Sequence, residues 1–133
     1  MRHIIPAFLF LLAGCYTPRT VAQIKRDVPA YDVRGIEWAQ SDIRYWRDYN
    51  ERDEFRTCDK TLELAFGDCD DYAKCAYEMT ADWPCEDRRI INYQPHYRGF
   101  YDERWHAVTF LRCDAGGIYG YFDNGEFKKG KPK

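Results

Sequence analysis

The sequence predicts a single α+β domain, with helices in its first half and an antiparallel sheet in its second half. Three observations support this prediction. Apolar residues recur at helical spacing between Gly35 and Asn50, a helix-start motif follows Gly67, and the segments from residue 88 onwards alternate like strands. A chain of 133 residues is long enough for one domain with a modest hydrophobic core. Helices followed by antiparallel strands are typical of an α+β architecture.

The amino-terminal residues resemble a bacterial export signal. Residues 1–14 combine a basic start, an apolar run over 4–12 and small residues directly before Cys15. An apolar run this short is typical of a signal peptide rather than of a membrane-spanning helix. The string LAGC resembles the lipobox, in which the cysteine becomes the lipidated first residue of the mature protein. The alternative is an ordinary cleaved signal in which Cys15 has no such role.

Lipidation at Cys15 would anchor the protein to a membrane, since each buried methylene adds about 0.8 kcal/mol of affinity. By resemblance to lipoprotein sorting rules, Tyr16 favours the outer membrane or the cell surface. Residues 15–34 contain two prolines and no sustained periodicity, so we expect a tether there. The folded domain is then expected over 35–127, with a frayed basic tail over 128–133.

Five cysteines remain after Cys15, and export places them in an oxidising compartment where most should pair. An odd number leaves at least one free thiol, which we expect to be Cys69. Connectivity does not follow from sequence, but proximity along the chain favours one pairing over the others. The expected disulfides are Cys75 with Cys85 and Cys58 with Cys113.

The charge balance gives no indication of a nucleic-acid partner. The formal net charge is −2, and lysines and arginines are scattered rather than clustered. Eleven tyrosines and four tryptophans predict a core and clefts rich in aromatic rings.

The string GDCDDYA places a cysteine among three carboxylates at the start of a predicted helix. Asp68 is expected to be the N-cap and Asp71 to complete a capping box, which puts Cys69 in the first turn. A helix N-terminus favours the thiolate form of a cysteine, but the carboxylates oppose it, so a cationic partner is needed. Calcium binding by Asp68 and Asp70 is the weaker alternative to capping.

Strands are expected over 88–93, 105–113 and 118–123, with a turn over 114–117. Of the three histidines, His3 lies in the signal, His96 in a loop, and His106 in the second strand.

The histidine inside a strand has a predictable acidic neighbour. If two or four residues connect the second and third strands, Asp123 faces Val108 and becomes a diagonal neighbour of His106 on the same face. An aspartate that orients an imidazole towards a thiol is the arrangement of a catalytic triad.

The strings GDCDDYA, RWHAV and FDNG, in this order, resemble the bacterial transglutaminase-like cysteine proteases, and the similarity spans roughly residues 43–125. The resemblance implies a papain/transglutaminase-like fold, in which the nucleophile lies at a helix N-terminus packed on a small antiparallel sheet. It also implies that Cys69 is the nucleophile, His106 the general base and acid, and Asp123 the orienting residue. The four other cysteines depart from the family pattern, so the resemblance does not define where the substrate groove lies.

The implied reaction is acyl transfer from a protein or peptide amide in the cell envelope, with hydrolysis favoured over transamidation. The backbone N–H of Cys69 would hold the oxyanion together with a second donor, for which Gln40, Asn50 and Trp46 are candidates. No cofactor is required for this chemistry, although some members of the family use calcium beside the cysteine.

Two other functions fit the same sequence. One is a non-catalytic, disulfide-stabilised envelope lipoprotein that acts as a binding module. Under it, Cys69 pairs in a disulfide, His106 is an ordinary strand histidine, and Asp123 belongs to an Asp-Asn-Gly turn. The other is a cell-wall peptide hydrolase or transamidase, but the Asp-Cys-Ser-Gly motif usual in such enzymes is absent.

Overall fold

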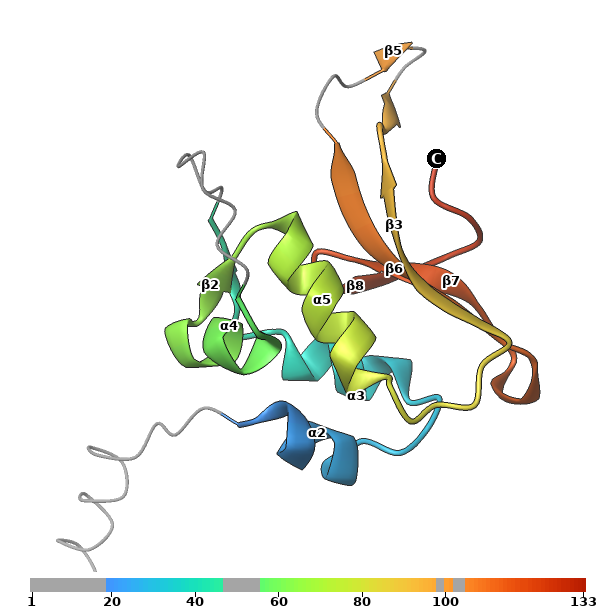
Figure 1. Ribbon diagram of the computed structural model, residues 1–133. Helices are drawn as coiled ribbons and strands as arrows, with labels where there is room; N and C mark the ends of the chain where they lie inside the picture. Colours follow the sequence, from blue (N-terminus) through green and yellow to red (C-terminus); the bar gives the residue numbers. More distant parts are fainter. Residues whose placement is uncertain (1–18, 47–55, 98–99, 102–104) are drawn as a thin grey trace, which may run out of the picture.

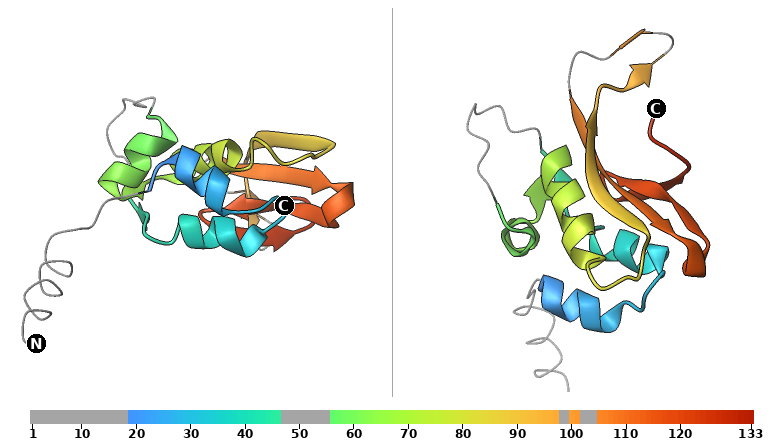
Figure 2. Two further views of the ribbon diagram at one scale, coloured as in Figure 1. Left: turned by 90° about the horizontal axis from the view of Figure 1, so that it is seen from below. Right: turned by 45° about the vertical axis from the view of Figure 1, so that its right-hand side comes forward.

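The computed structural model describes residues 19–46, 56–97, 100–101 and 105–133, and in these residues the chain forms a small α+β domain, as predicted (Figure 1). One face of a four-stranded antiparallel sheet is covered by helices, which lie to one side of the strands (Figure 2). The helices are α2 (Val21–Asp27), α3 (Val33–Ala39), α4 (Cys58–Leu64) and α5 (Cys69–Met79).

The sheet has the strand order β3-β6-β7-β8, and each neighbouring pair is antiparallel. Two further strand pairs lie outside it, a parallel pair and a short antiparallel one. The strands of the sheet are β3 (Asp87–Tyr93), β6 (His106–Cys113), β7 (Ile118–Asp123) and β8 (Glu126–Lys129). The short strands are β1 (Arg44–Tyr45), β2 (Phe66–Gly67), β4 (His96–Tyr97) and β5 (Phe100–Tyr101).

Helix α5 packs directly on the sheet and forms the centre of the core. The hydroxyl of Thr109 in β6 donates to the carbonyl of Ala73 in α5, which ties helix and strand together. Apolar side chains from both layers meet around this contact, and the most deeply buried include Ile24, Ile36, Met79, Leu111 and Phe122. The core therefore fixes the position of α5 relative to β6 and β7.

The predicted register of the β6–β7 hairpin is confirmed. Thr109 pairs with Phe122 and Cys113 pairs with Ile118, so four residues connect the strands. The connection contains a short 3₁₀ turn over Asp114–Gly116.

The first predicted helix is shorter than expected and starts earlier. Asp32 caps α3, because its side chain accepts from the backbone N–H of Gly35. The helix ends at Ala39, and the chain continues into β1 instead of remaining helical towards Asn50, which lies outside the described residues.

The tether predicted over residues 15–34 is wrong for its second half. Thr20 and Gln23 form a capping box that starts α2, and Ile24 is buried in the core. A seven-residue helix is too short to show clear periodicity, and packing stabilises it instead. The basic tail predicted over 128–133 is also partly wrong, because Lys128 and Lys129 belong to β8.

Both disulfides differ from the expected pairing. Cys58 pairs with Cys75, because α4 lies beside α5, and Cys85 pairs with Cys113, because the chain entering β3 runs beside the end of β6. Two disulfides are consistent with an extracellular or otherwise oxidising location. Within the described ranges, no helix has the length and apolar character needed to span a membrane.

Candidate active site

The GDCDDYA motif forms the start of α5 as the sequence predicts. Asp68 is the N-cap, and its Oδ1 accepts from the backbone N–H groups of Asp70 and Asp71. The Oδ2 atom of Asp71 accepts in return from the N–H of Asp68, which completes the capping box. Cys69 is therefore the first residue of the helix, where the positive end of the helix dipole lies.

An arginine offsets part of the negative charge at this helix start. The guanidinium of Arg56 lies 2.6 Å from Oδ2 of Asp71, and both side chains are largely buried. Burial and the neighbouring charge of Asp71 raise the pKa of Asp68. The carboxylates of Asp68 and Asp71 thus stabilise the helix start, and Arg56 is a partner of Asp71 that the sequence pattern does not predict.

Cys69, His106 and Asp123 converge from α5, β6 and β7. Nε2 of His106 lies 2.5 Å from Oδ1 of Asp123, to which it donates. The imidazole also interacts with the side chain of Cys69, and since Asp123 occupies Nε2, Nδ1 is the nitrogen left for the thiol. Cys69 is partly exposed and is the free cysteine among the described residues. All three residues proposed from the sequence therefore lie together.

The surroundings favour a protonated imidazole at neutral pH. The hydrogen bond to Asp123, followed by that to Cys69, raises the pKa of His106 to about 9. Burial raises the pKa of Asp123, but the hydrogen bonds from His106 and Lys128 outweigh it, so that the net shift is downwards. An ionised carboxylate and an imidazolium are the forms in which such a pair stabilises a neighbouring thiolate.

A row of four polar side chains crosses the end of the sheet, one from each strand. Tyr93 is the direct partner of His106 in the β3–β6 pair, and the two rings meet edge to face with centroids 5.8 Å apart. Burial, with the charge of Asp123 second, raises the pKa of Tyr93 to about 12. On the other side of the row, Nζ of Lys128 lies 2.8 Å from Oδ2 of Asp123.

Tyr93 and Lys128 are members of the site that the sequence motifs do not indicate. The position of Lys128 is predictable from the dipeptide Asn124-Gly125, because Asn-Gly strongly favours a two-residue hairpin turn. That turn pairs Asp123 with Glu126 and brings Lys128 to the same face.

The N–H of Cys69 suits an oxyanion, because the first residue of an α-helix has no helical carbonyl partner. Among the predicted second donors, Gln40 is buried, and its amide donates to the carbonyl of Tyr72. The backbone N–H of Trp46 donates to Gly67. Asn50 lies outside the described residues.

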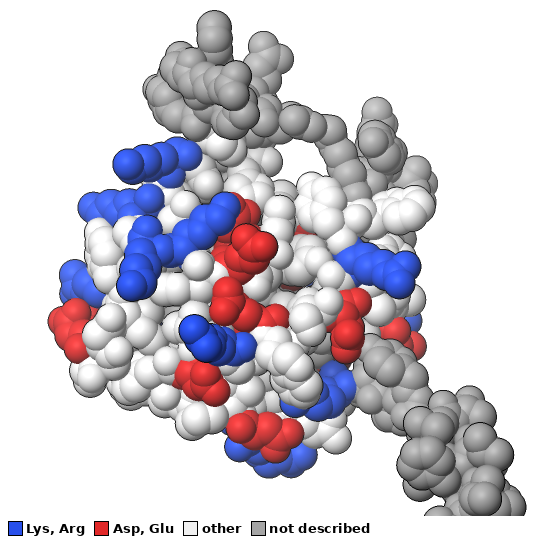
Figure 3. All heavy atoms as spheres, turned by 180° about the vertical axis from the view of Figure 1, so that it is seen from behind, with Lys and Arg blue, Asp and Glu red and all other residues white. Residues whose placement is uncertain are grey.

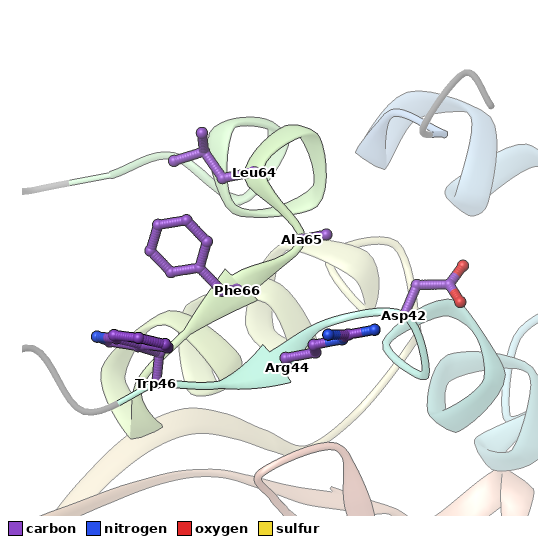
Figure 4. A pocket seen from close by; sticks show the side chains of 6 residues that line it. All are labelled: Asp42, Arg44, Trp46, Leu64, Ala65 and Phe66. Atoms are coloured by element: carbon purple, nitrogen blue, oxygen red, sulfur yellow. The ribbon is translucent and has the colours of Figure 1, made fainter.

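A separate surface hollow of about 740 Å³ lies over β1 and β2. Figure 4 shows the indole of Trp46 beside the ring of Phe66, with Leu64 above them and Arg44 further along β1. Tyr45, between Arg44 and Trp46, stacks on Tyr72 of α5. Since side chains alternate along a strand, the lining residues of β1 face away from Tyr72. The Trp46 side chain is therefore part of this hollow.

The sequence also suggests roles for Cys15 in lipidation and for Asp68 and Asp70 in calcium binding. Cys15 lies outside the described residues, and His96 lies in β4. For calcium, the described residues contain no group of three or more acidic, cysteine or histidine side chains that could hold a metal ion. Calcium at Asp68 and Asp70 therefore stays a prediction, and no step proposed below uses it.

Comparisons of the chain with protein-family models, with curated proteins and with solved structures find no match. The geometry and chemistry of Cys69, His106 and Asp123 are therefore the basis for a function.

Proposed function

We propose that this protein is a cysteine peptidase or amidase of the cell envelope, with a papain/transglutaminase-like active site, that hydrolyses a protein or peptide amide. The observation that carries the proposal is the imidazole of His106, which is hydrogen-bonded to Asp123 and interacts with the free thiol of Cys69. The resemblance of the surrounding motifs to transglutaminase-like cysteine proteases supports it. Lipid anchoring through Cys15 belongs to the same proposal.

In the first half of the reaction, the thiolate of Cys69 attacks the amide carbonyl carbon and forms a tetrahedral intermediate. The N–H of Cys69 stabilises the negative oxygen. When the intermediate collapses, the C–N bond breaks and His106 gives its proton to the leaving amine. The product is a thioester on Cys69 and a neutral imidazole.

In the second half, His106 takes a proton from water as the water attacks the thioester. The C–S bond then breaks, a carboxylic acid leaves, and the thiolate–imidazolium pair is restored. Asp123 stays ionised throughout and keeps the ring oriented through Nε2. An amine in place of water would give transamidation by the same steps.

The direct test compares the wild-type chain with Cys69→Ser on a peptide library derived from envelope proteins, in water enriched in ¹⁸O. We expect new peptide termini in the wild-type sample alone, each with one ¹⁸O atom in the new carboxylate. Identical termini in both samples would contradict the proposal.

The two rival functions give different results in that experiment. A binding module leaves the library uncut even with Cys69, His106 and Asp123 in place. A cell-wall enzyme leaves envelope peptides uncut but releases fragments from purified wall peptides, again only when Cys69 is present.

A further inference from the structure

The carboxylate of Asp123 has two cationic partners, one on each oxygen. His106 donates to Oδ1 at 2.5 Å, and the ammonium group of Lys128 donates to Oδ2 at 2.8 Å. The Asp123 side chain is only 14% exposed, whereas that of Lys128 is 48% exposed. A largely buried carboxylate is thus held between cations from the two neighbouring strands.

The strand register places these cations symmetrically around Asp123. Asp123 pairs directly with Glu126 in β8, and Lys128 lies two residues further along on the same face. His106 has the same diagonal relation to Asp123 on the β6 side. The turn between β7 and β8 fixes this geometry, since Asn124 and Gly125 have positive φ angles of 47° and 86°.

We propose that Lys128 is a positioning residue of the active site, which fixes Asp123 through Oδ2 and shares the negative charge that Asp123 presents to His106. This inference rests on the proposed function, because it takes Cys69, His106 and Asp123 as the reacting group and its support. His106 must release a proton to the leaving amine, and an imidazolium facing an unshared carboxylate holds its proton more tightly. Lys128 therefore makes His106 a better acid while it keeps Asp123 in place.

Other titratable groups also face this pair. Tyr93 from β3 interacts electrostatically with Asp123, and its raised pKa keeps it neutral while His106 titrates. Tyr121 from β7 and Glu126 from β8 interact with Lys128, and Cys69 approaches His106 from α5. Elsewhere on the surface, Figure 3 shows basic and acidic side chains next to one another on the face opposite to the one seen in Figure 1. Among these named groups, Lys128 supplies the positive charge that acts on Asp123 besides His106.

The test is a proton NMR titration of the His106 ring in the full chain, with a His106→Gln sample to identify its signal. We compare Lys128→Met with Lys129→Met, which removes the same charge one residue away, on the opposite face of β8. We expect the His106 pKa to rise by about half a pH unit in Lys128→Met, the effect of one charge a few ångströms away at a hydrated site. Lys129→Met should match the wild type, and Lys128→Arg should restore the wild-type value because it keeps the charge.

No shift in Lys128→Met, a downward shift, or an equal shift in Lys129→Met would overturn the inference. The titration does not depend on turnover, so it separates the two proposals. An upward shift in a protein that cleaves no amide supports the role of Lys128 towards His106 and removes the peptidase proposal. Amide cleavage that depends on Cys69, with no shift in Lys128→Met, supports the peptidase and removes the role of Lys128.

Discussion

Nε2 of His106 lies 2.5 Å from Oδ1 of Asp123, although the two residues are not direct partners in the β6–β7 pair. They meet diagonally, because the four-residue connection between the strands sets the register. A slip of one residue would turn Asp123 to the opposite face of the sheet. The register of this hairpin is therefore a requirement of the candidate triad.

The thiol content of the oxidised protein provides a first test. Among the five cysteines that follow Cys15, we expect one to react with iodoacetamide under denaturing, non-reducing conditions. Peptide mapping should identify it as Cys69. Reduction should expose four more thiols, since Cys58, Cys75, Cys85 and Cys113 are paired. Recovery of Cys69 in a disulfide would remove the nucleophile from the account.

Substitution of Asp123 should separate its charge from its hydrogen bond. Asp123→Asn keeps an acceptor for Nε2 but removes the charge, so the His106 pKa should fall from about 9 towards its ordinary 6.5. His106 then loses its proton at lower pH, so the alkaline limb of the pH–rate profile for hydrolysis shifts to lower pH. Asp123→Ala also removes the acceptor and should cost about a hundredfold in kcat/KM.

A matched control for these variants is Asp114→Asn, which removes an exposed carboxylate in the β6–β7 connection. It should leave the profile unchanged. The same displacement of the alkaline limb in Asp114→Asn would show that net charge, and not the contact with His106, sets the profile.

The sequence predicted the parts of the fold that local patterns determine. Residues 118–123 alternate clearly and form β7 with the expected bounds, and the capping box of Asp68 and Asp71 marks the start of α5. The placement of His106 beside Asp123 followed from a turn length and the alternation of strand side chains. Each of these inferences needed only residues close together in the sequence.

The missed features depend on contacts between distant segments. Helix α4 lies in a stretch without clear periodicity, and the Cys58–Cys75 bond fixes it to α5. The local pattern of residues 20–28 predicts a tether, because the burial of Ile24 depends on contacts with distant parts of the chain. The local sequence places Lys128 in a basic tail. Its role depends on Asp123, which lies across a hairpin on the neighbouring strand.

The disulfide between the helices should contribute to stability. Replacing Cys58 and Cys75 together by serine opens a loop of sequence separation 17, for which the chain-entropy model gives a loss of about 3 kcal/mol in the free energy of unfolding. Urea unfolding followed by circular dichroism measures the loss. A double variant as stable as the wild type would show that α4 is held by packing alone.

The N-cap of α5 should have a smaller and chemically specific effect. Asp68→Ala removes the acceptor for the N–H groups of Asp70 and Asp71, and should lower the free energy of unfolding by about 1 kcal/mol. Asp68→Ser retains a capping oxygen and should recover most of that loss in the same denaturation experiment. Equal losses in both variants would indicate a role for the carboxylate other than capping.

The central claim is that His106 activates the thiol of Cys69, and the rate of Cys69 alkylation as a function of pH tests it most directly. His106 carries a positive charge up to a pH of about 9, so Cys69 should react rapidly already near neutral pH, with a further inflection as the ring loses its proton. In His106→Ala, alkylation at neutral pH should fall by at least about tenfold, and the rate should rise in one step like that of a free cysteine. Superimposable profiles for the wild type and His106→Ala would contradict the claim.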